Sequence, residues 1–349
     1  MEKALRRVLS GIAVLLLAPL ASGQSMHTTQ ALIDGAALSV NYPNTFWVQS
    51  DASDGGTRQF TGVRLNDWYG ITVGHGFFEG GVTYSNHVGG NGSNFLSGPG
   101  NTFTFADVWI HPQWGGTIGG SSVDLAIVRF NAPWAGSAVT IGTAAEDELL
   151  TYSGFGTPAT PSTGFLPADG QRRAFQTYLD DFGSPLFASF HIDGVFRRPG
   201  HPEFLALGGV GTPGNSGGGV WNDSGELVGI MAAQSLAPNH SGATYSMYLD
   251  PFVPWIDSII SALPGDYDAD GSVGQADLNL VLLNWGTTGV PTGWVNEPPA
   301  GEIGQAELNG VLLNWGSGAA EPSRVPEPGA ALLVLAGLGR ARRRRGGSS

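Results

Sequence analysis

The sequence predicts a mainly β protein with many turns, and three observations support this prediction. The 349 residues include 55 glycines and 22 prolines, and glycine would cost each helix interior that it entered up to about 1 kcal/mol relative to alanine. Hydrophobic residues make up 41% of the chain and aromatic residues 10%, which is enough for packed cores. Short β-prone runs alternate with turns rich in Gly, Asn, Asp and Pro. The clearest runs are residues 46–49, 70–73, 102–110, 124–130 and 226–231.

One helix is predicted in this β-rich part, over residues 251–263. Asp250 is a candidate N-cap, and apolar residues recur at helical spacing from Phe252 to Ile260. A barrel fold closed by a single terminal helix fits this pattern.

The composition excludes several classes of protein. No cysteine is present, which excludes a disulfide scaffold, a thiolate metal site and a cysteine nucleophile. The formal net charge is −13, and the basic residues gather at the two ends of the chain. Because the acidic body between these ends repels phosphate backbones, nucleic acid is not an expected partner.

The N-terminus has the order of a secretory signal peptide. Lys3, Arg6 and Arg7 precede an apolar run over residues 12–20 and the small residues 21–23. We expect residues 1–23 to be removed and the chain to be exported. Export without cysteines indicates a bacterial source.

The C-terminus carries a second address. The motif Pro326-Glu327-Pro328 precedes an apolar stretch over residues 329–339 and an arginine cluster between residues 340 and 345. This order resembles the PEP-CTERM sorting signal of bacteria, which implies processing by an exosortase and delivery to the cell surface or its matrix. Residues 317–349 are interpreted as a linker and this signal.

The sharpest chemical signal is residues 214–218, Gly-Asn-Ser-Gly-Gly. A serine hydroxyl is a poor nucleophile until a base removes its proton, and the developing oxyanion needs fixed donors. The glycines around Ser216 allow a tight turn that aims the N–H groups of Gly214 and Ser216 at one point. The motif therefore predicts a nucleophile with an oxyanion hole, provided that a base and an orienting acid accompany it.

Both groups occur upstream. His75 follows the strand-like run 68–73 and lies between Gly74 and Gly76. Asp124 begins a strongly apolar strand, where a carboxylate is costly to bury unless a donor such as a histidine N–H faces it. The order along the chain is therefore His, Asp, Ser.

With these residues in this order, the chain resembles the chymotrypsin-like (trypsin family) serine proteases over about residues 31–263. Residues 68–76 are similar to that family's Trp-x-x-Thr-Ala-x-His segment, and residues 110–114 to its Val-His-Pro-x-Tyr segment. Residues 214–218 match its nucleophile motif, and the run from Gly229 through the helix around Trp255 continues the likeness. The resemblance implies two six-stranded antiparallel β-barrels with a C-terminal helix over residues 24–263.

The resemblance also implies a role for each residue. His75 is the general base and then the general acid, Asp124 orients its imidazole, and Ser216 forms the acyl-enzyme. Gly214 and Ser216 donate the oxyanion-hole N–H groups, and no cofactor is expected for catalysis.

Departures from the family pattern bear on activation and specificity. Asn215 replaces an aspartate that pairs with a newly cut N-terminus in many members, so activation by that ion pair is not expected. Val210 takes the base of the specificity pocket, where its apolar side chain argues against cleavage after Lys or Arg. Ala232, Ala233 and Gln234 take the pocket wall. The side chain of Gln234 narrows the pocket. Ala232 lacks the hydroxyl that often supports the aspartate in this family. Small or medium apolar residues are favoured.

Residues 264–316 contain an internal repeat. The run from Gly274 to Gly286 recurs from Gly304 to Gly316, and each copy predicts a short amphipathic helix. Before the first copy, aspartates stand at the first, third, fifth and twelfth places of a loop with glycine at the sixth, which is the oxygen-ligand pattern of a calcium loop. We expect one structural calcium ion on four ligands: Asp266, Asp268, Asp270 and Asp277.

This arrangement resembles a dockerin type I domain, a pair of calcium-loop and helix repeats. Membership implies a cohesin partner. The second loop keeps only Glu307 among its carboxylate positions, so a calcium-stabilised stalk stays open as the other interpretation.

The sequence thus predicts an exported, surface-associated serine endopeptidase that acts on protein or peptide substrates. Two alternatives remain at this stage. The barrel part could be catalytically inactive and act as a surface binding protein, or the dockerin-like part could carry the function in an assembly.

Overall fold

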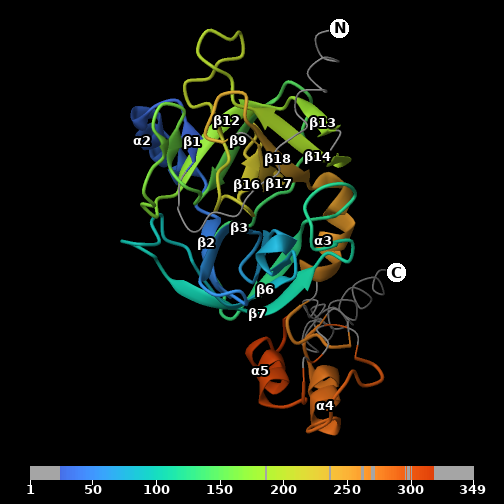
Figure 1. Cartoon of the computed structure of the whole chain (residues 1–349). Helices are drawn as coiled ribbons and strands as arrows, with labels where there is room; N and C mark the ends of the chain where they lie inside the picture. The colour runs from blue at the N-terminus through green and yellow to red at the C-terminus, as the bar shows by residue number, and fades with distance from the viewer. Residues whose placement is uncertain are drawn as a thin grey trace, which may run out of the picture. The chain divides into compact units, whose positions relative to one another are not determined.

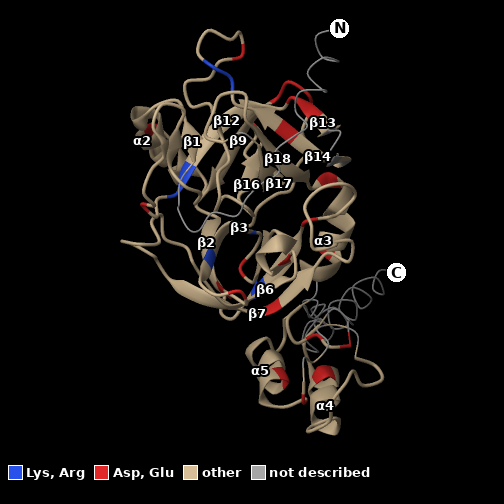
Figure 2. Ribbon diagram, in the orientation of Figure 1, with Lys and Arg blue, Asp and Glu red and all other residues tan. Residues whose placement is uncertain are grey.

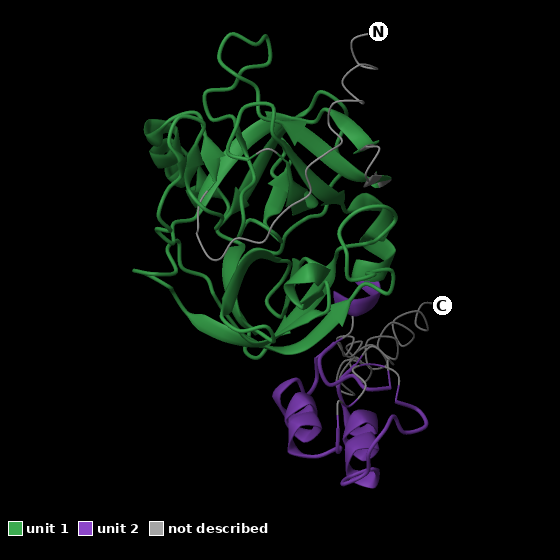
Figure 3. Cartoon of the chain, in the orientation of Figure 1, with its two compact units in different colours: residues 1–256 green, residues 257–349 purple. Residues whose placement is uncertain are grey.

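The structure is a computed structural model, and it describes residues 24–184, 187–235, 237–260, 263–268, 272–294, 296, 299 and 301–317. The predicted signal peptide and sorting signal lie outside the described residues, apart from residue 317. The chain divides into two compact units, residues 1–256 and 257–349 (Figure 3). Within the described residues, no helix is both long and apolar enough to cross a membrane.

The first half of unit 1 is a closed antiparallel barrel of six strands (Figure 1). The strands follow the order β2-β3-β4-β8-β7-β6, and the pairing of β2 with β6 closes the ring, while the short β5 extends β6. Their bounds are β2 Thr45–Ala52, β3 Thr57–Arg64, β4 Tyr69–Thr72, β5 Phe78–Glu79, β6 Val82–Gly90, β7 Thr102–Ile110 and β8 Ala126–Phe130.

Aromatic side chains fill this barrel. Phe46, Phe103 and Phe130 meet edge-on or tilted, with ring centroids 4.8–5.6 Å apart. Gly62 on β3 makes room for them, because a Cβ there would lie 2.2 Å from Phe46 Cζ. The predicted mainly β class and the first closed barrel are confirmed.

The second half of unit 1 is a curved antiparallel sheet in the order β12-β9-β16-β17-β18-β14-β13. Strand β14 curls back toward the edge strand β12, since a Cβ on Gly194 of β14 would lie 1.9 Å from Thr177 Oγ1 of β12. The strands are β9 Leu149–Gly154, β12 Arg173–Tyr178, β13 Asp181–Ser184, β14 Phe187–Val195, β16 Gly219–Trp221, β17 Leu227–Gln234 and β18 Ala243–Tyr248.

This second sheet is a half-barrel, in place of the second six-stranded barrel that the resemblance implies. The reason lies at the outer edge of β12. The Gln176 N–H donates to the Leu207 carbonyl at 2.9 Å, and Gln176 forms a parallel bridge with Gly208. The segment before β15 therefore takes the hydrogen-bonding edge that β14 would need for closure.

A small third sheet joins the start of the chain to the second half, in the order β11-β10-β1-β15. Its strands are β1 Ser25–Met26, β10 Ala159–Thr160, β11 Gly164–Phe165 and β15 Gly209–Val210. Ser25 pairs with Val210, so the buried N-terminal segment lies beside the strand that leads toward residues 214–218.

The prediction of a single helix in unit 1 is wrong, because helix α2 (Thr29–Leu38) precedes the barrel. Thr28 Oγ1 accepts the Ala31 N–H at 3.1 Å and so caps the N-terminus of α2. Gly35 weakens the helical pattern of this segment in the sequence. The same glycine allows the helix to pack against β12, since a Cβ there would lie 2.6 Å from the Ala174 carbonyl oxygen. The predicted terminal helix starts as a 3-10 turn at Asp250–Phe252 and continues as α3 (Val253–Ile260).

Unit 2 is small and helical, as the internal repeat predicts for this part. Helices α4 (Gln275–Leu283) and α5 (Gln305–Leu313) occupy equivalent places in the two copies. Their core includes Tyr267, Val281 and Val311, all buried.

Acidic side chains outnumber basic ones over the described chain (Figure 2).

Arg64, at the end of β3, ties a long connection to the barrel. Its side chain is 0% exposed. Its guanidinium donates to the carbonyl oxygens of Trp134 and Ser137, both at 2.7 Å, and to the Asn44 side chain at 3.1 Å. It also pairs with Asp67 at 2.7 Å. A buried guanidinium with this many acceptors holds residues 131–140 in place.

Replacing Arg64 with leucine is therefore expected to lower the free energy of unfolding by about 3 kcal/mol, because the carbonyl oxygens of Trp134 and Ser137 and the carboxylate of Asp67 lose a charged donor. Urea unfolding measures the change. Arg58→Leu is the matched control, since the partly exposed Arg58–Asp54 pair is worth about 0–1 kcal/mol. Equal effects of the two substitutions would contradict this role for Arg64.

Candidate active site

His75 is positioned by the end of strand β4. The chain leaves β4 at Thr72 and makes a short 3-10 turn over Gly74–Gly76, which carries the imidazole. Gly74 lets the indole of Trp114 pack against this turn, since a Cβ at Gly74 would lie 3.0 Å from Trp114 Cγ. The rings of His75 and Trp114 are 6.4 Å apart. Strand β4 and the indole of Trp114 therefore hold the turn that carries the imidazole.

Asp124 lies just before strand β8 and is 1% exposed. Its Oδ2 is 2.6 Å from His75 Nδ1, and its Oδ1 accepts the His75 backbone N–H at 2.8 Å. One histidine thus satisfies both oxygens of a buried carboxylate. With the carboxylate on Nδ1, the Nε2 of His75 is the nitrogen left to act as a base.

Ser216 comes from the other half of the unit, on the connection from β15 to β16. This connection docks on the barrel through Thr61 of β3. The Thr61 N–H donates to the Ser216 carbonyl at 2.7 Å, and Thr61 Oγ1 donates to the Gly214 carbonyl at 2.8 Å. The nucleophile segment therefore lies against the strands that lead into His75.

Gly217 makes this docking possible. Its φ is +86°, and a Cβ there would lie 1.8 Å from the Thr61 carbonyl oxygen and 2.2 Å from Thr72 Oγ1. Only glycine fits such a close approach with this backbone conformation. Thr72 stands three residues before His75, so this contact joins the nucleophile turn to the strand that carries the base.

The structure brings His75 and Asp124 into contact, whereas the third predicted contact is open. Among the described residues, the Ser216 hydroxyl makes no hydrogen bond, to His75 or to any other group. Nucleophile and base are often farther apart in a free enzyme than in its substrate complex. The assignment of Ser216 as nucleophile thus rests on its segment and not on a formed hydrogen bond.

The backbone around Ser216 offers donors in the predicted pattern. The N–H groups of Asn215, Gly217 and Gly218 donate to the carbonyls of Thr212, Met231 and Asn215, respectively. Within the described part of the chain, the N–H groups of Gly214 and Ser216 have no such acceptor. These two N–H groups are the ones predicted to bind the oxyanion.

The residues predicted for the specificity pocket lie together. Val210 is fully buried, and its Cγ2 would be 3.4 Å from a Cβ on Gly242. Gln234 pairs with Thr244, whose hydroxyl accepts the Gly211 N–H at 2.9 Å. Ala232 is 2% exposed, and Ala233 and Gln234 are half-buried. Val210 and Ala232 are thus covered in the free protein, whereas Ala233 and Gln234 are partly exposed.

Strand β17 has an open edge beside the nucleophile. Its pairing with β16 ends at Ile230, and Met231 then bonds to the backbone of Gly217 and Gly218 at 2.8 Å each. Beyond Met231, the described strands pair with β17 on one side only, through β18. An extended peptide can pair with such an edge.

Asn215 is 2% exposed, and its Nδ2 is 3.9 Å from Met231 Sδ. Its amide oxygen is buried and unpaired within the described chain. A charged carboxylate in this place would cost more to bury than a neutral amide. The buried environment therefore suits the asparagine.

Sequence patterns did not identify Thr61, which positions the nucleophile segment. Threonine is ordinary on a strand, and its role depends on a contact with residues more than 150 positions away. Sequence patterns also did not identify Trp114, which packs against the turn that carries His75.

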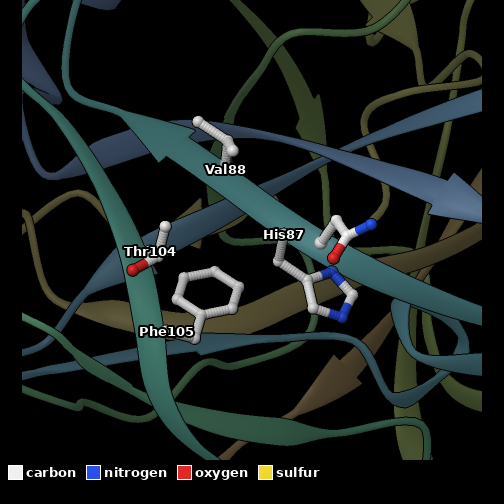
Figure 4. Close-up of a pocket in the computed structure, with 5 residues that line it drawn as sticks. His87, Val88, Thr104 and Phe105 are labelled. Carbon is white, nitrogen blue, oxygen red and sulfur yellow. The ribbon is translucent and has the colours of Figure 1, made fainter.

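A separate hollow lies on the barrel, where the pairing of β6 with β7 stops (Figure 4). His87 at this hollow is 2.6 Å from Ser50 Oγ and stacks on Phe105. None of the residues predicted for catalysis or specificity lines it. Its lining residues are Asn86, His87, Val88, Thr104 and Phe105.

In unit 2, three of the four predicted calcium ligands are described, and they come together. One carboxylate oxygen from each of Asp266, Asp268 and Asp277 lies within 4.8 Å of the others. Asp266 and Asp277 are buried, and Asp270 lies outside the described residues. Three carboxylates this close repel one another unless a cation lies between them, so the donor set fits calcium.

Asp277 also shapes the loop. Its Oδ1 accepts the N–H groups of Tyr267 and Asp268 at 2.7 and 3.3 Å, and its Oδ2 accepts the Gly274 N–H at the start of α4. In the second copy, Glu307 accepts the Gly304 N–H in the same way. Asn296, which stands at a ligand position of the second loop, instead donates to the Asp266 carbonyl at 2.8 Å.

No protein-family model and no curated protein sequence matches the chain. Among solved structures, it is similar to HL collagenase, with 13% identity, a TM-score of 0.48, and coverage of 70% of this chain and 99% of that one. It is also similar to the scabies mite inactivated protease paralogue S-I1, with 16% identity, a TM-score of 0.45, and coverage of 62% and 94%. Both TM-scores are below 0.5, so the account of the site rests on the geometry of this chain.

The electrostatic environment raises the pKa of His75. Burial alone lowers the pKa, but the charge of Asp124, its hydrogen bond to the ring and the charge of Glu79 together outweigh burial. The net direction is upward from the ordinary value of 6.5. The imidazole of His75 is therefore mostly neutral, and able to act as a base, only at a pH above this raised pKa.

An NMR titration of the histidine ring signals should accordingly give His75 a pKa above 6.5. In Asp124→Asn, burial remains while the main opposing charge is lost, so the pKa should fall below that of the wild type. Asp107→Asn is the control, because Asp107 pairs with Arg129 on the barrel strands. A His75 pKa that does not respond to Asp124→Asn would show that the two residues are not coupled.

Proposed function

We propose that unit 1 is a serine endopeptidase that cleaves peptide bonds through Ser216, His75 and Asp124. The observation that carries this proposal is the Asp124–His75 pair, together with the docking of the Ser216 segment on Thr61 beside it. A buried carboxylate that orients a histidine toward a glycine-flanked serine is the arrangement of a charge-stabilised general base.

The chemistry follows from these positions. His75 Nε2 takes the proton from Ser216 Oγ as the oxygen attacks the scissile carbonyl, and Asp124 stabilises the imidazolium that forms. The N–H groups of Gly214 and Ser216 donate hydrogen bonds to the oxyanion of the tetrahedral intermediate. His75 then gives the proton to the leaving amine, and water releases the acyl group by the same steps in reverse order.

Substrate binding is proposed along the open edge of β17. A peptide that pairs there lies beside Ser216 and presents a side chain to the surface around Val210. The apolar side chain of Val210 and the small size of Ala232 and Ala233 favour small or medium apolar side chains. A lysine or arginine would find no carboxylate among these residues.

Labelling with a serine-directed phosphonate tests this function. The wild type should lose peptidase activity as one phosphonate attaches to Ser216, and Ser216→Ala should neither react nor cleave. Activity should fall by roughly 10⁶-fold when the nucleophile is removed. Ser121→Ala is the matched control, since that serine is exposed.

If the folded wild type fails to react, the alternative holds. The unit would then be an inactive barrel that binds peptides at the surface. Ser216 would lack a hydrogen bond to His75 with substrate bound as well as without it.

We further propose that unit 2 holds one structural calcium ion on Asp266, Asp268, Asp270 and Asp277. The support is the close approach of three of these carboxylates. Calcium would neutralise their charges and fix the loop that starts α4.

Export and surface delivery complete the proposal. They rest on the sequence of residues 1–23 and 317–349, with removal of the first segment and exosortase-type processing of the second. The partner of the catalytic unit is then a protein or peptide outside the bacterial cytoplasm.

Calcium should stabilise the full chain, with a gain for unit 2 of about 2.7 kcal/mol when its concentration is 100 times the dissociation constant. Calorimetry with calcium and with a chelator measures this shift. Asp268→Asn should abolish the calcium effect and, because it relieves repulsion, should be at least as stable as the wild type in the chelator. Glu302→Gln is the control and should keep the calcium effect. A calcium response that survives Asp268→Asn would contradict the ligand set.

A further inference from the structure

Two segments from distant parts of the chain flank Val210, the predicted base of the specificity pocket. Strand β1 is one of them, since Ser25 pairs with Val210. The connection from β17 to β18 is the other, since a Cβ on Gly242 would lie 3.4 Å from Val210 Cγ2. The two segments also meet each other, because the Ser25 hydroxyl donates to the Pro238 carbonyl at 2.7 Å. The position of Val210 therefore depends on how β1 and this connection are held together.

A pair of histidines holds these segments together. His27 follows β1, and its Nδ1 is 3.1 Å from Nε2 of His240, which lies on the connection from β17 to β18. The His27 Nε2 is 3.0 Å from the Leu205 carbonyl oxygen. The two imidazole rings are 5.2 Å apart, and both contact the ring of Phe196. His27 is thus bound to two connections that stand 178 and 213 residues further along the chain.

The two hydrogen bonds fix where the protons of the pair lie. A carbonyl oxygen can only accept, so His27 Nε2 carries a proton that it donates to Leu205. The Nδ1 atom of a neutral His27 is then an acceptor, and His240 Nε2 supplies the proton between the rings. A further proton on one ring still leaves a donor facing an acceptor. With both rings charged, two N–H groups face each other and the contact breaks.

The neighbouring charges do not offset this repulsion. Arg198, on the connection after β14, opposes a positive charge on His240. The acid of the same connection, Glu203, binds Arg197 at 3.0 Å and lies 3.9 Å from His201 Nδ1. Within the described residues, no carboxylate pairs with either ring of the two histidines.

The environment of the pair favours its neutral form. Burial lowers the pKa of both rings below the ordinary value of 6.5. Repulsion by His240 lowers the pKa of His27 further, against the hydrogen bond to Leu205, which raises it. The chain with the pair separated therefore binds protons more readily than the chain with the pair intact. The contact is complete above pH 6.5 and weakens as the pH falls below that value.

We propose that His27 and His240 are positioning residues that hold the proposed specificity pocket in shape, and that joint protonation of the two rings releases it. The inference rests on the proposed peptidase function. When both rings are charged, β1 separates from the connection that carries His240, and Val210 loses the support of both. Substrates that use the pocket then bind less tightly and their KM rises. The attack by Ser216 uses neither ring, so kcat follows the protonation of His75 alone.

His240→Gln tests the proposal, because a glutamine amide can donate to His27 Nδ1 but does not titrate. His201→Gln is the matched control, since His201 is a partly exposed histidine outside the pair. Two quantities are compared at about pH 7.5 and about pH 5. One is the KM for a peptide ester with an apolar residue at the cleaved carbonyl. The other is the amide hydrogen exchange of residues 25–27, measured in Ser216→Ala chains and corrected for intrinsic rates.

Uptake of one more proton over this pH range shifts an opening equilibrium by up to about 30-fold. In the wild type and in His201→Gln, the protection of residues 25–27 should therefore fall roughly tenfold at the lower pH, and KM should rise severalfold. Both changes should be much smaller in His240→Gln.

Equal pH dependence in the wild type and in His240→Gln would overturn the role of the pair. Loss of protection with an unchanged KM would overturn its link to the pocket. A wild type that does not react with a serine-directed phosphonate would instead overturn the proposed function, and the exchange measurement would still report on the pair.

Discussion

Asp124 is almost completely buried at the start of an apolar strand, and its carboxylate accepts two hydrogen bonds from a single residue, His75. A buried charge without donors would be strongly destabilising, so this pair constrains both the fold and the site. Ala232 offers no hydroxyl in support, and His75 supplies both of the donors found in the described chain. The same pair that makes the carboxylate tolerable also sets the ring orientation and raises the pKa of the imidazole.

The second constraint is the junction between the two halves of unit 1. Ser216 is useful only if its segment lies at a fixed place relative to the barrel, and Thr61 provides that place through its backbone N–H and its hydroxyl. Gly217 permits the approach because it has no Cβ. The position of Ser216 is therefore determined by a connection that bridges the two halves.

Local chemistry made much of this predictable from the sequence. Strand β7 has the predicted bounds, and His75, Asp124 and Ser216 were each marked by their immediate neighbours. Long-range packing accounts for what was missed. Helix α2 contains Gly35, which weakens its pattern but is required by its contact with Ala174. The half-barrel stays open because Gln176 pairs with the segment before β15. The role of Thr61 exists only through residues far along the chain.

The central claim is that the imidazole oriented by Asp124 activates the hydroxyl of Ser216. Acid quenching during turnover of an activated acyl ester, followed by mass spectrometry of the digested protein, tests it most directly. The account predicts one acyl group on the peptide that contains Ser216 in the wild type, and none in His75→Ala. An acyl group on a different residue, or equal acylation of Ser216 in both proteins, would contradict it.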